Sequence, residues 1–178
     1  LLDGKYNVIG LDNFSNSKRS VLDNITKITG KSIKFYEGNM LDKALLDKIF
    51  SENEIDAVID FAAFKSVGDS VSKPIEYYIN NVSSVLTLLS VMKNHNVKTL
   101  VFSSSATVYG DSKIMPITEE CKIGGTTNPY GTSKLYCEGI LQDLYKSDND
   151  WNICIFRYFT QKTGLVSIDK DVHFSSWH

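Results

Sequence analysis

The feature that most constrains the fold is a regular alternation of short β-branched segments with longer segments of helical periodicity. Strands are expected over residues 6–11, 33–36, 56–63, 99–103 and 153–159, and helices over 18–29, 74–94, 129–146 and a stretch that begins after Asp42. Strands separated by helical crossovers of this length pair in parallel, because a parallel neighbour needs a long connection. The sequence therefore predicts an open, doubly wound α/β sheet.

The carboxyl ends of the strands are where such a sheet binds its ligands. The expected strand ends are small or polar: Asp12-Asn13, Gly38-Asn39, Phe61-Ala62-Ala63 and Ser103-Ser104-Ser105. Serines at the end of a buried strand place hydroxyls near a bound substrate, although serines also cap helices and form turns. We therefore expect the functional site at this edge of the sheet.

Composition excludes several classes of partner. The 178 residues carry 19 basic and 21 acidic side chains, a net charge of −2, which leaves no electrostatic footprint for nucleic acid or an anionic membrane. The apolar runs are too short to span a bilayer and no secretory signal is expected, so the cytoplasm is the expected location. Cys121, Cys137 and Cys154 have neither zinc-site nor CxxC spacing, and we expect buried free thiols and no metal site.

The beginning of the chain, Leu1-Leu2-Asp3-Gly4, carries no methionine, and we expect a piece of a longer protein. An acid that ends a strand about 20 residues after a glycine-rich turn commonly holds an adenosine ribose. Asp12 is placed for that role, but no GxGxxG motif occurs in the sequence, so the turn is expected before residue 1. The alternative is that Asp12 simply forms a turn.

The main chemical candidate is the Tyr130-Gly131-Thr132-Ser133-Lys134 segment. Tyr130 and Lys134 are four residues apart on an expected helix and so share one face. A cation beside a phenol favours the phenolate, which then accepts a proton from an alcohol or sugar hydroxyl. The two other Tyr-x-x-x-Lys pairs fall on a turn and on a strand, where this spacing does not bring the side chains together.

Several segments resemble a known family in order and in register as far as Phe159. They are residues 11–18 (LDNFSNSK), 65–71 (KSVGDSV), 74–78 (PIEYY), 102–110 (FSSSATVYG) and 129–134 (PYGTSK). The chain is similar to the UDP-glucose 4-epimerases, which are extended short-chain dehydrogenases/reductases. The resemblance implies a Rossmann-like doubly wound parallel sheet that lacks its first strand and the C-terminal substrate domain. Residues 1–159 would be a partial NAD-binding domain, and residues 160–178 a divergent tail.

The resemblance also implies a reaction and a set of site residues. The reaction interconverts UDP-glucose and UDP-galactose by oxidation and re-reduction at sugar C4, with NAD as cofactor. Tyr130 would move the proton of the 4-hydroxyl group, Ser105 would relay or orient it, and Lys134 would lower the tyrosine pKa and bind the nicotinamide ribose. The implied cofactor-binding residues are Asp12, Asn13, Asn16, Ser17, Asn39, Met40, Phe61, Ala62, Ala63, Lys65, Asn80 and Phe159.

A few positions depart from the family pattern, and two alternatives stay open. Asn39 stands where the family has Asp, Ala63 where it often has Gly, and Thr160 where it has an Asn that contacts the UDP-sugar. Dehydration is disfavoured because Ala106-Thr107 replaces the Asp-Glu pair of the related 4,6-dehydratases. The open alternatives are a 4-epimerase of another UDP-sugar, such as UDP-N-acetylglucosamine or UDP-glucuronate, and a catalytically inactive fragment.

The packing of the helices and the continuity of the sheet are the remaining structural expectations. The helix over 74–94 is apolar on more than one face, so it is either buried deep in its own domain or packed on a partner subunit as well. The resemblance implies a homodimer through helices 74–94 and 129–146. It also implies that the strands 6–11 and 56–63 flank the position of a missing strand, and we expect a strand-wide gap or a forced pairing there.

Overall fold

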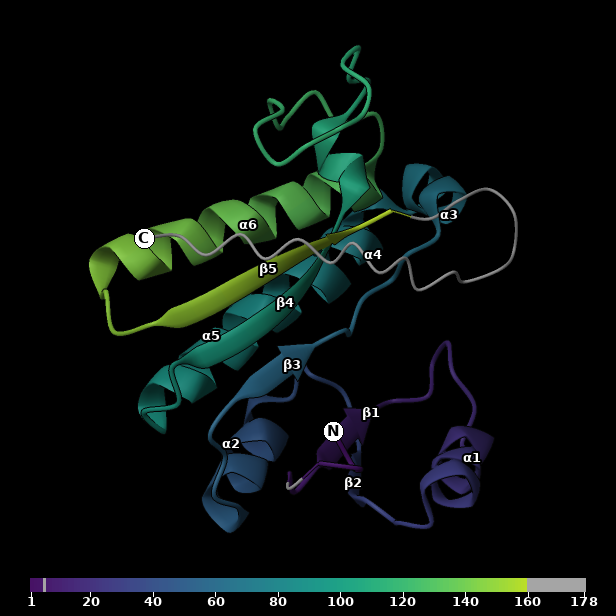
Figure 1. Ribbon diagram of the computed structural model, residues 1–178, viewed down its shortest axis with the longest axis vertical. Coiled ribbons are helices and arrows are strands. Elements are labelled where there is room, and N and C mark those ends of the chain that lie inside the picture. The colour runs from purple at the N-terminus through teal and green to yellow at the C-terminus, as the bar shows by residue number, and fades with distance from the viewer. Residues whose placement is uncertain (5, 160–178) are drawn as a thin grey trace.

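The structure is a computed structural model that describes residues 1–4 and 6–159 (Figure 1). Its strands are β1 (Ile9–Asp12), β2 (Lys34–Glu37), β3 (Val58–Asp60), β4 (Thr99–Ser105) and β5 (Asn152–Tyr158). Its helices are α1 (Ser20–Thr29), α2 (Lys43–Glu52), α3 (Val67–Ser72), α4 (Pro74–Tyr78), α5 (Ser84–Asn94) and α6 (Pro129–Ser147), with a π-helical turn η1 (Ile79–Ser83) and a 3₁₀ turn η2 (Ala106–Tyr109).

All five strands pair in parallel, which confirms the predicted α/β class. They form two ladders, β1–β2 and β3–β4–β5. Within the described residues β1 and β3 do not pair with each other, and Figure 1 shows the two ladders as separate groups of arrows. The expected separation between the strands at 6–11 and 56–63 is therefore present.

Strand β3 is much shorter than the predicted strand over 56–63. Val58, Ile59 and Asp60 pair with β4, and the flanking residues are not part of a ladder. A strand that is paired on one side only has fewer hydrogen bonds to keep it extended, which accounts for the difference. By contrast, β4 pairs on both sides and runs to Ser105, two residues beyond its predicted end.

The helix termini follow the sequence signals. Asp42 caps α2 by accepting a hydrogen bond from the Leu45 amide at 3.0 Å, and Gly30 ends α1 with a left-handed φ of 68°.

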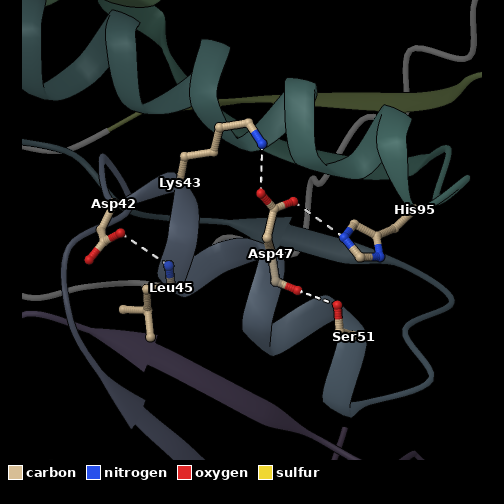
Figure 2. A network of polar contacts seen from close by, with 6 residues as sticks. All are labelled: Asp42, Lys43, Leu45, Asp47, Ser51 and His95. Atoms are coloured by element: carbon tan, nitrogen blue, oxygen red, sulfur yellow. Dashed lines mark hydrogen bonds and ion pairs between the residues drawn. The ribbon is translucent and has the colours of Figure 1, made fainter.

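Figure 2 shows the Asp47 carboxylate of α2 between Lys43 and His95, which is the C-cap of α5. Lys43 and then His95 lower the pKa of Asp47. The His95 contact joins α2 to the end of α5.

The predicted helix over 74–94 is interrupted, which corrects its expected regularity. Pro74 begins α4 as expected, but the chain then makes the π-helical turn η1 before α5. The Ser84 hydroxyl bonds the Asn80 carbonyl at this point. A π-helical turn adds one residue to the helix and rotates the residues that follow, a change that periodicity does not reveal. The short helix α3 was likewise not predicted.

The main core lies around the β3–β4–β5 ladder. Its buried residues include Leu88 and Met92 of α5, Leu100 and Phe102 of β4, Leu141 of α6 and Trp151. Helix α1, in contrast, has no fully buried residue: Leu22 and Ile25 of its expected apolar stripe are half-buried, and Val21 and Ile28 are exposed, Ile28 to 83%. The two-stranded β1–β2 ladder offers too little surface to cover that stripe.

The remaining expectations concern membrane spans, thiols and the tail. No helix within residues 1–4 and 6–159 is long and apolar enough to cross a membrane. Cys121, Cys137 and Cys154 are free thiols, of which Cys154 is only partly buried. The predicted tail 160–178 lies outside the described residues.

Candidate active site

Ser105, Tyr130 and Lys134 meet where β4 ends and α6 begins. Ser105 is the last residue of β4, and Tyr130 lies in the first turn of α6, which Asn128 caps by accepting from the Gly131 amide at 2.8 Å. Gly131 allows the helix to approach η2 closely, because a Cβ at this position would lie 3.2 Å from Thr107. The residues at the end of β4 and at the beginning of α6 therefore lie close together.

Tyr130 is half-buried beside Ser105. Burial raises the pKa of the Tyr130 phenol above its usual value, and the polar side chain of Ser105 acts in the opposite direction. The neighbouring Tyr77 raises this pKa further. The sequence predicts a lowered pKa, so the structure differs from that expectation, and desolvation is the dominant cause.

Lys134 is buried, with 4% of its surface exposed, and its ammonium group points to β4. The Nζ atom donates to the Ser103 carbonyl at 2.7 Å and lies 4.7 Å from the centroid of the Phe102 ring. Burial lowers the pKa of Lys134, while the nearby Asp60 and Cys137 raise it. One of the three ammonium hydrogens is thus used by the protein backbone, and two remain for a ligand.

A buried ionic network that the sequence did not reveal holds α6 against the sheet. Glu138, fully buried, accepts from Arg157 of β5 at 3.0 and 2.7 Å and from the Ser104 hydroxyl at 2.5 Å. The same guanidinium donates to the Tyr109 hydroxyl at 2.8 Å. Because Glu138 is one turn beyond Lys134, the network fixes the helix face that carries both candidate catalytic side chains.

Asn81, in η1, is a second residue that sequence reasoning missed. Its side chain is buried and makes reciprocal hydrogen bonds with the backbone of Phe64, at 2.8 and 2.9 Å, and donates to Ser133 Oγ at 3.1 Å. It therefore ties the segment after β3 to α6. A buried polar side chain in the middle of an apolar helix is the signal that points to such a role.

The cofactor-side residues near β1 form a compact turn. Asp12 accepts from the Phe14 amide at 2.7 Å and from Ser17 Oγ at 2.9 Å, and Asn13 accepts from the Ser15 amide at 2.9 Å. Asn16 donates to the Ala63 carbonyl at 3.4 Å, so this turn reaches the segment after β3 across the gap between the ladders. Asp12 thus forms a turn, and its carboxylate oxygens retain lone pairs for a further donor.

The other expected cofactor-binding residues lie after β2, after β3, in η1 and after β5. The Asn39 side chain accepts from the Leu41 amide, Met40 packs on the core, and Asn80 donates to Asn81. Phe61 and Phe159 are 64% and 60% exposed, Ala62 donates its amide to Asp60, and Lys65 is exposed. The structure places all these residues beyond or beside carboxyl ends of strands, except Asn80, which is on the helix that follows α4.

The chemistry available to this arrangement is proton transfer beside a buried cation. Tyr130 and Ser105 supply hydroxyl groups that donate and accept protons, and Lys134 supplies positive charge and two free donors. Among the described residues, no three His, Cys, Asp or Glu side chains lie together in a way that could hold a metal ion. The exposed aromatic side chains of Phe61 and Phe159 provide apolar surface for a planar ligand.

Comparison with known proteins identifies relatives over nearly all of the chain. It is 53% identical over 173 residues to UDP-glucose 4-epimerase of Pasteurella multocida, a match that covers 95% of this chain and 51% of that protein. It is 54% identical over 173 residues to UDP-glucose 4-epimerase of Haemophilus influenzae, again covering 95% and 51%. The chain thus spans about half the length of the curated relatives it matches.

Solved structures agree with the sequence relatives. UDP-glucose 4-epimerase of Bifidobacterium longum, crystallised with NAD⁺ and UDP, superposes with a TM-score of 0.86 at 56% identity. That match covers 88% of this chain and 47% of the other. A family model described as the NAD dependent epimerase/dehydratase family matches residues 1–161. The chain therefore belongs to the NAD dependent epimerase/dehydratase family.

Proposed function

We propose that the intact protein containing this chain interconverts UDP-glucose and UDP-galactose with NAD as cofactor. The observation that carries this proposal is the cluster of Ser105, Tyr130 and Lys134 at the end of β4, in a chain about 50% identical to UDP-glucose 4-epimerases. Residues 1–159 are the proposed NAD-binding portion. The relatives that match the chain include an epimerase structure with bound NAD⁺ and UDP, which supports the choice of cofactor and substrate class.

The proposed NAD contacts come from residues at or near the strand ends, whose free hydrogen-bonding groups support this role. Asp12 keeps free lone pairs for ribose hydroxyls, with Asn13, Asn16 and Ser17 beside it. The remaining proposed NAD contacts are Asn39, Met40, Phe61, Ala62, Ala63, Lys65, Asn80 and Phe159. Lys134 retains two ammonium donors for the nicotinamide ribose.

The proposed mechanism assigns the proton to Tyr130. Bound NAD supplies the chemistry of accepting hydride from sugar C4 and returning it to the opposite face. The Tyr130 phenolate would accept the proton of the sugar 4-hydroxyl group in one direction, and the phenol so formed would donate it back in the other. Ser105 would orient that proton, and it lowers the phenol pKa, which is the direction that a base requires. The side chains that shift the phenol pKa in the structure are Ser105 and Tyr77 and not Lys134, whose ammonium is directed at the Ser103 carbonyl, so we propose that Lys134 acts through the nicotinamide ribose.

Replacement of Tyr130 tests the proposal directly. In the intact protein with UDP-galactose as substrate, we expect Tyr130→Phe to lower kcat by about 100-fold or more, because acid–base catalysis is worth about 10²–10⁴. Product formation is measured by separation of the two UDP-sugars. The matched control is Tyr145→Phe, which removes a hydroxyl from the same helix and leaves turnover near that of the wild type. Equal rates for Tyr130→Phe and the wild type would remove Tyr130 from this role.

The same assay separates the alternatives. Turnover of UDP-N-acetylgalactosamine or UDP-galacturonate in place of UDP-galactose would assign another UDP-sugar. No turnover of any of the three, together with intact folding, would favour the inactive chain. The proposal predicts that UDP-galactose has the highest kcat/KM.

The proposed assembly is a homodimer, and the proposed location is the cytoplasm. A groove between α5 and α6 is lined by the apolar side chains of Leu86, Leu89, Ile140 and Leu144. Leu86 is 49% exposed in this groove, and an exposed apolar groove between two helices supports contact with a second subunit. The free thiols at Cys121 and Cys137 support a reducing compartment.

A further inference from the structure

Asp60 is a buried acid that the proposed mechanism does not use. It ends the short apolar strand β3, and only 4% of its surface is exposed. Its Oδ1 atom accepts from the Ala62 amide at 2.9 Å, whereas Oδ2 has no hydrogen-bond partner within the described part of the chain. A carboxylate buried in this way is costly unless a nearby charge compensates it.

The compensating charge is Lys134. Asp60 is the register partner of Phe102 on the neighbouring strand, and the Lys134 ammonium lies over the Phe102 ring. Burial raises the pKa of Asp60 and lowers that of Lys134, and the attraction between the two charges opposes both changes. The other group that faces Lys134 is the Cys137 thiol of α6, whose pKa burial raises to about 12, so it carries no charge near neutral pH.

The other buried acid of this region is already occupied. Both carboxylate oxygens of Glu138 accept from Arg157, and one accepts from Ser104 as well. Asp60 is therefore the carboxylate available to balance the buried ammonium. Deprotonation of Lys134 would remove the positive charge from the candidate active site, and desolvation favours that change.

We propose that Asp60 is a positioning residue of the active site, whose buried carboxylate keeps Lys134 in its ammonium form and directed at Ser103. This inference rests on the proposed function for its catalytic consequence, but the coupling between the two charges is independent of it. A purely structural role for Asp60 would consist of its bond to the Ala62 amide, which an asparagine also makes. The charge is the property that distinguishes the two roles.

The test is Asp60→Asn, with Asp56→Asn as the matched control. Asp56 is exposed and precedes β3 by two residues, so its variant makes the same chemical change without removing a buried charge. In the intact protein labelled with [6-¹³C]lysine, we expect the Lys134 resonance, assigned with Lys134→Met, to titrate at lower pH in Asp60→Asn and at the wild-type pH in Asp56→Asn. The alkaline limb of the kcat profile moves to lower pH with it, and kcat above neutral pH falls by about tenfold with KM changed less than about threefold.

A double-mutant cycle covers the case in which Asp60→Asn folds poorly. The urea midpoints of Asp60→Asn, Lys134→Met and the double variant should be non-additive, with the double variant more stable than the sum of the single losses predicts. An unchanged Lys134 titration or additive midpoints would overturn the proposal. Failure of the proposed function gives another result: Tyr130→Phe then has full turnover, while the effect of Asp60→Asn on the Lys134 titration and the non-additive urea midpoints are still observed.

Discussion

Removal of the charge on Glu138 should be among the most destabilising single changes in this chain. The Glu138 side chain is 1% exposed and that of Arg157 15% exposed, so water does not screen the pair. In Glu138→Gln the new amide NH₂ faces an Arg157 N–H donor in either orientation, and the guanidinium stays buried without a counter-ion. Breaking a buried pair on one side costs about 3–5 kcal/mol, a large fraction of a typical stability.

Urea unfolding followed by circular dichroism measures this cost. The matched control is Asp143→Asn on the same helix, whose partner Lys146 is 72% exposed, and whose loss should be under about 1 kcal/mol. Replacing both members of the buried pair, as in Glu138→Leu with Arg157→Met, should cost less than the sum of the single changes, because neither charge is then left alone. A loss for Glu138→Gln as small as that of the control would refute the reasoning.

Two further predictions follow from the thiols and the helix groove. Burial raises the pKa of the Cys137 thiol to about 12 in the folded chain, whereas the thiol titrates near 9.0 in the unfolded chain. Between these two pH values the folded chain binds more protons than the unfolded chain. The free energy of unfolding therefore falls as the pH rises, by up to about 1.4 kcal/mol per pH unit. In urea titrations at pH 9–11, Cys137→Ala should weaken this pH dependence of the free energy of unfolding, and Cys154→Ala should weaken it less. The same pH dependence in Cys137→Ala as in the wild type would contradict the burial of the thiol. Leu86→Glu places a charge in the α5–α6 groove and should shift the intact protein from dimer to monomer in sedimentation velocity, whereas Ile28→Glu, on an 83% exposed side chain of α1, should not. A monomeric wild type would reject the dimer.

The order of strands and helices could be predicted from sequence because each signal is local. Gly30, Asp42 and Pro74 act within one helical turn, and all three end or begin helices as expected. The limits of β3 and the exposure of α1 depend instead on which neighbours cover each element. Such coverage is a property of the tertiary structure, and the apolar pattern of α1 does not contain it.

The candidate site shows the same division. The spacing of Tyr130 and Lys134 predicts a shared helix face, and the structure places both beside the end of β4. The spacing did not reveal that burial raises the pKa of the phenol. Nor did it reveal Asp60, because an acid in a short apolar strand gains a partner only when α6 folds across the strand beside it.

The division of the sheet into two ladders has a consequence for how the chain opens. The β1–β2 ladder and α1 bury little surface, while the β3–β4–β5 ladder surrounds the core, so native-state hydrogen exchange should be fast in the first and slow in β4. Between them, the bond from Asn16 to Ala63 is a weak link, whereas α2 packs Leu46, Ile49 and Phe50 into the same core as α5. A dinucleotide that touches Asp12 on one ladder and Lys134 on the other would close the first ladder onto the second. Binding and local folding of residues 6–37 would then be a single event.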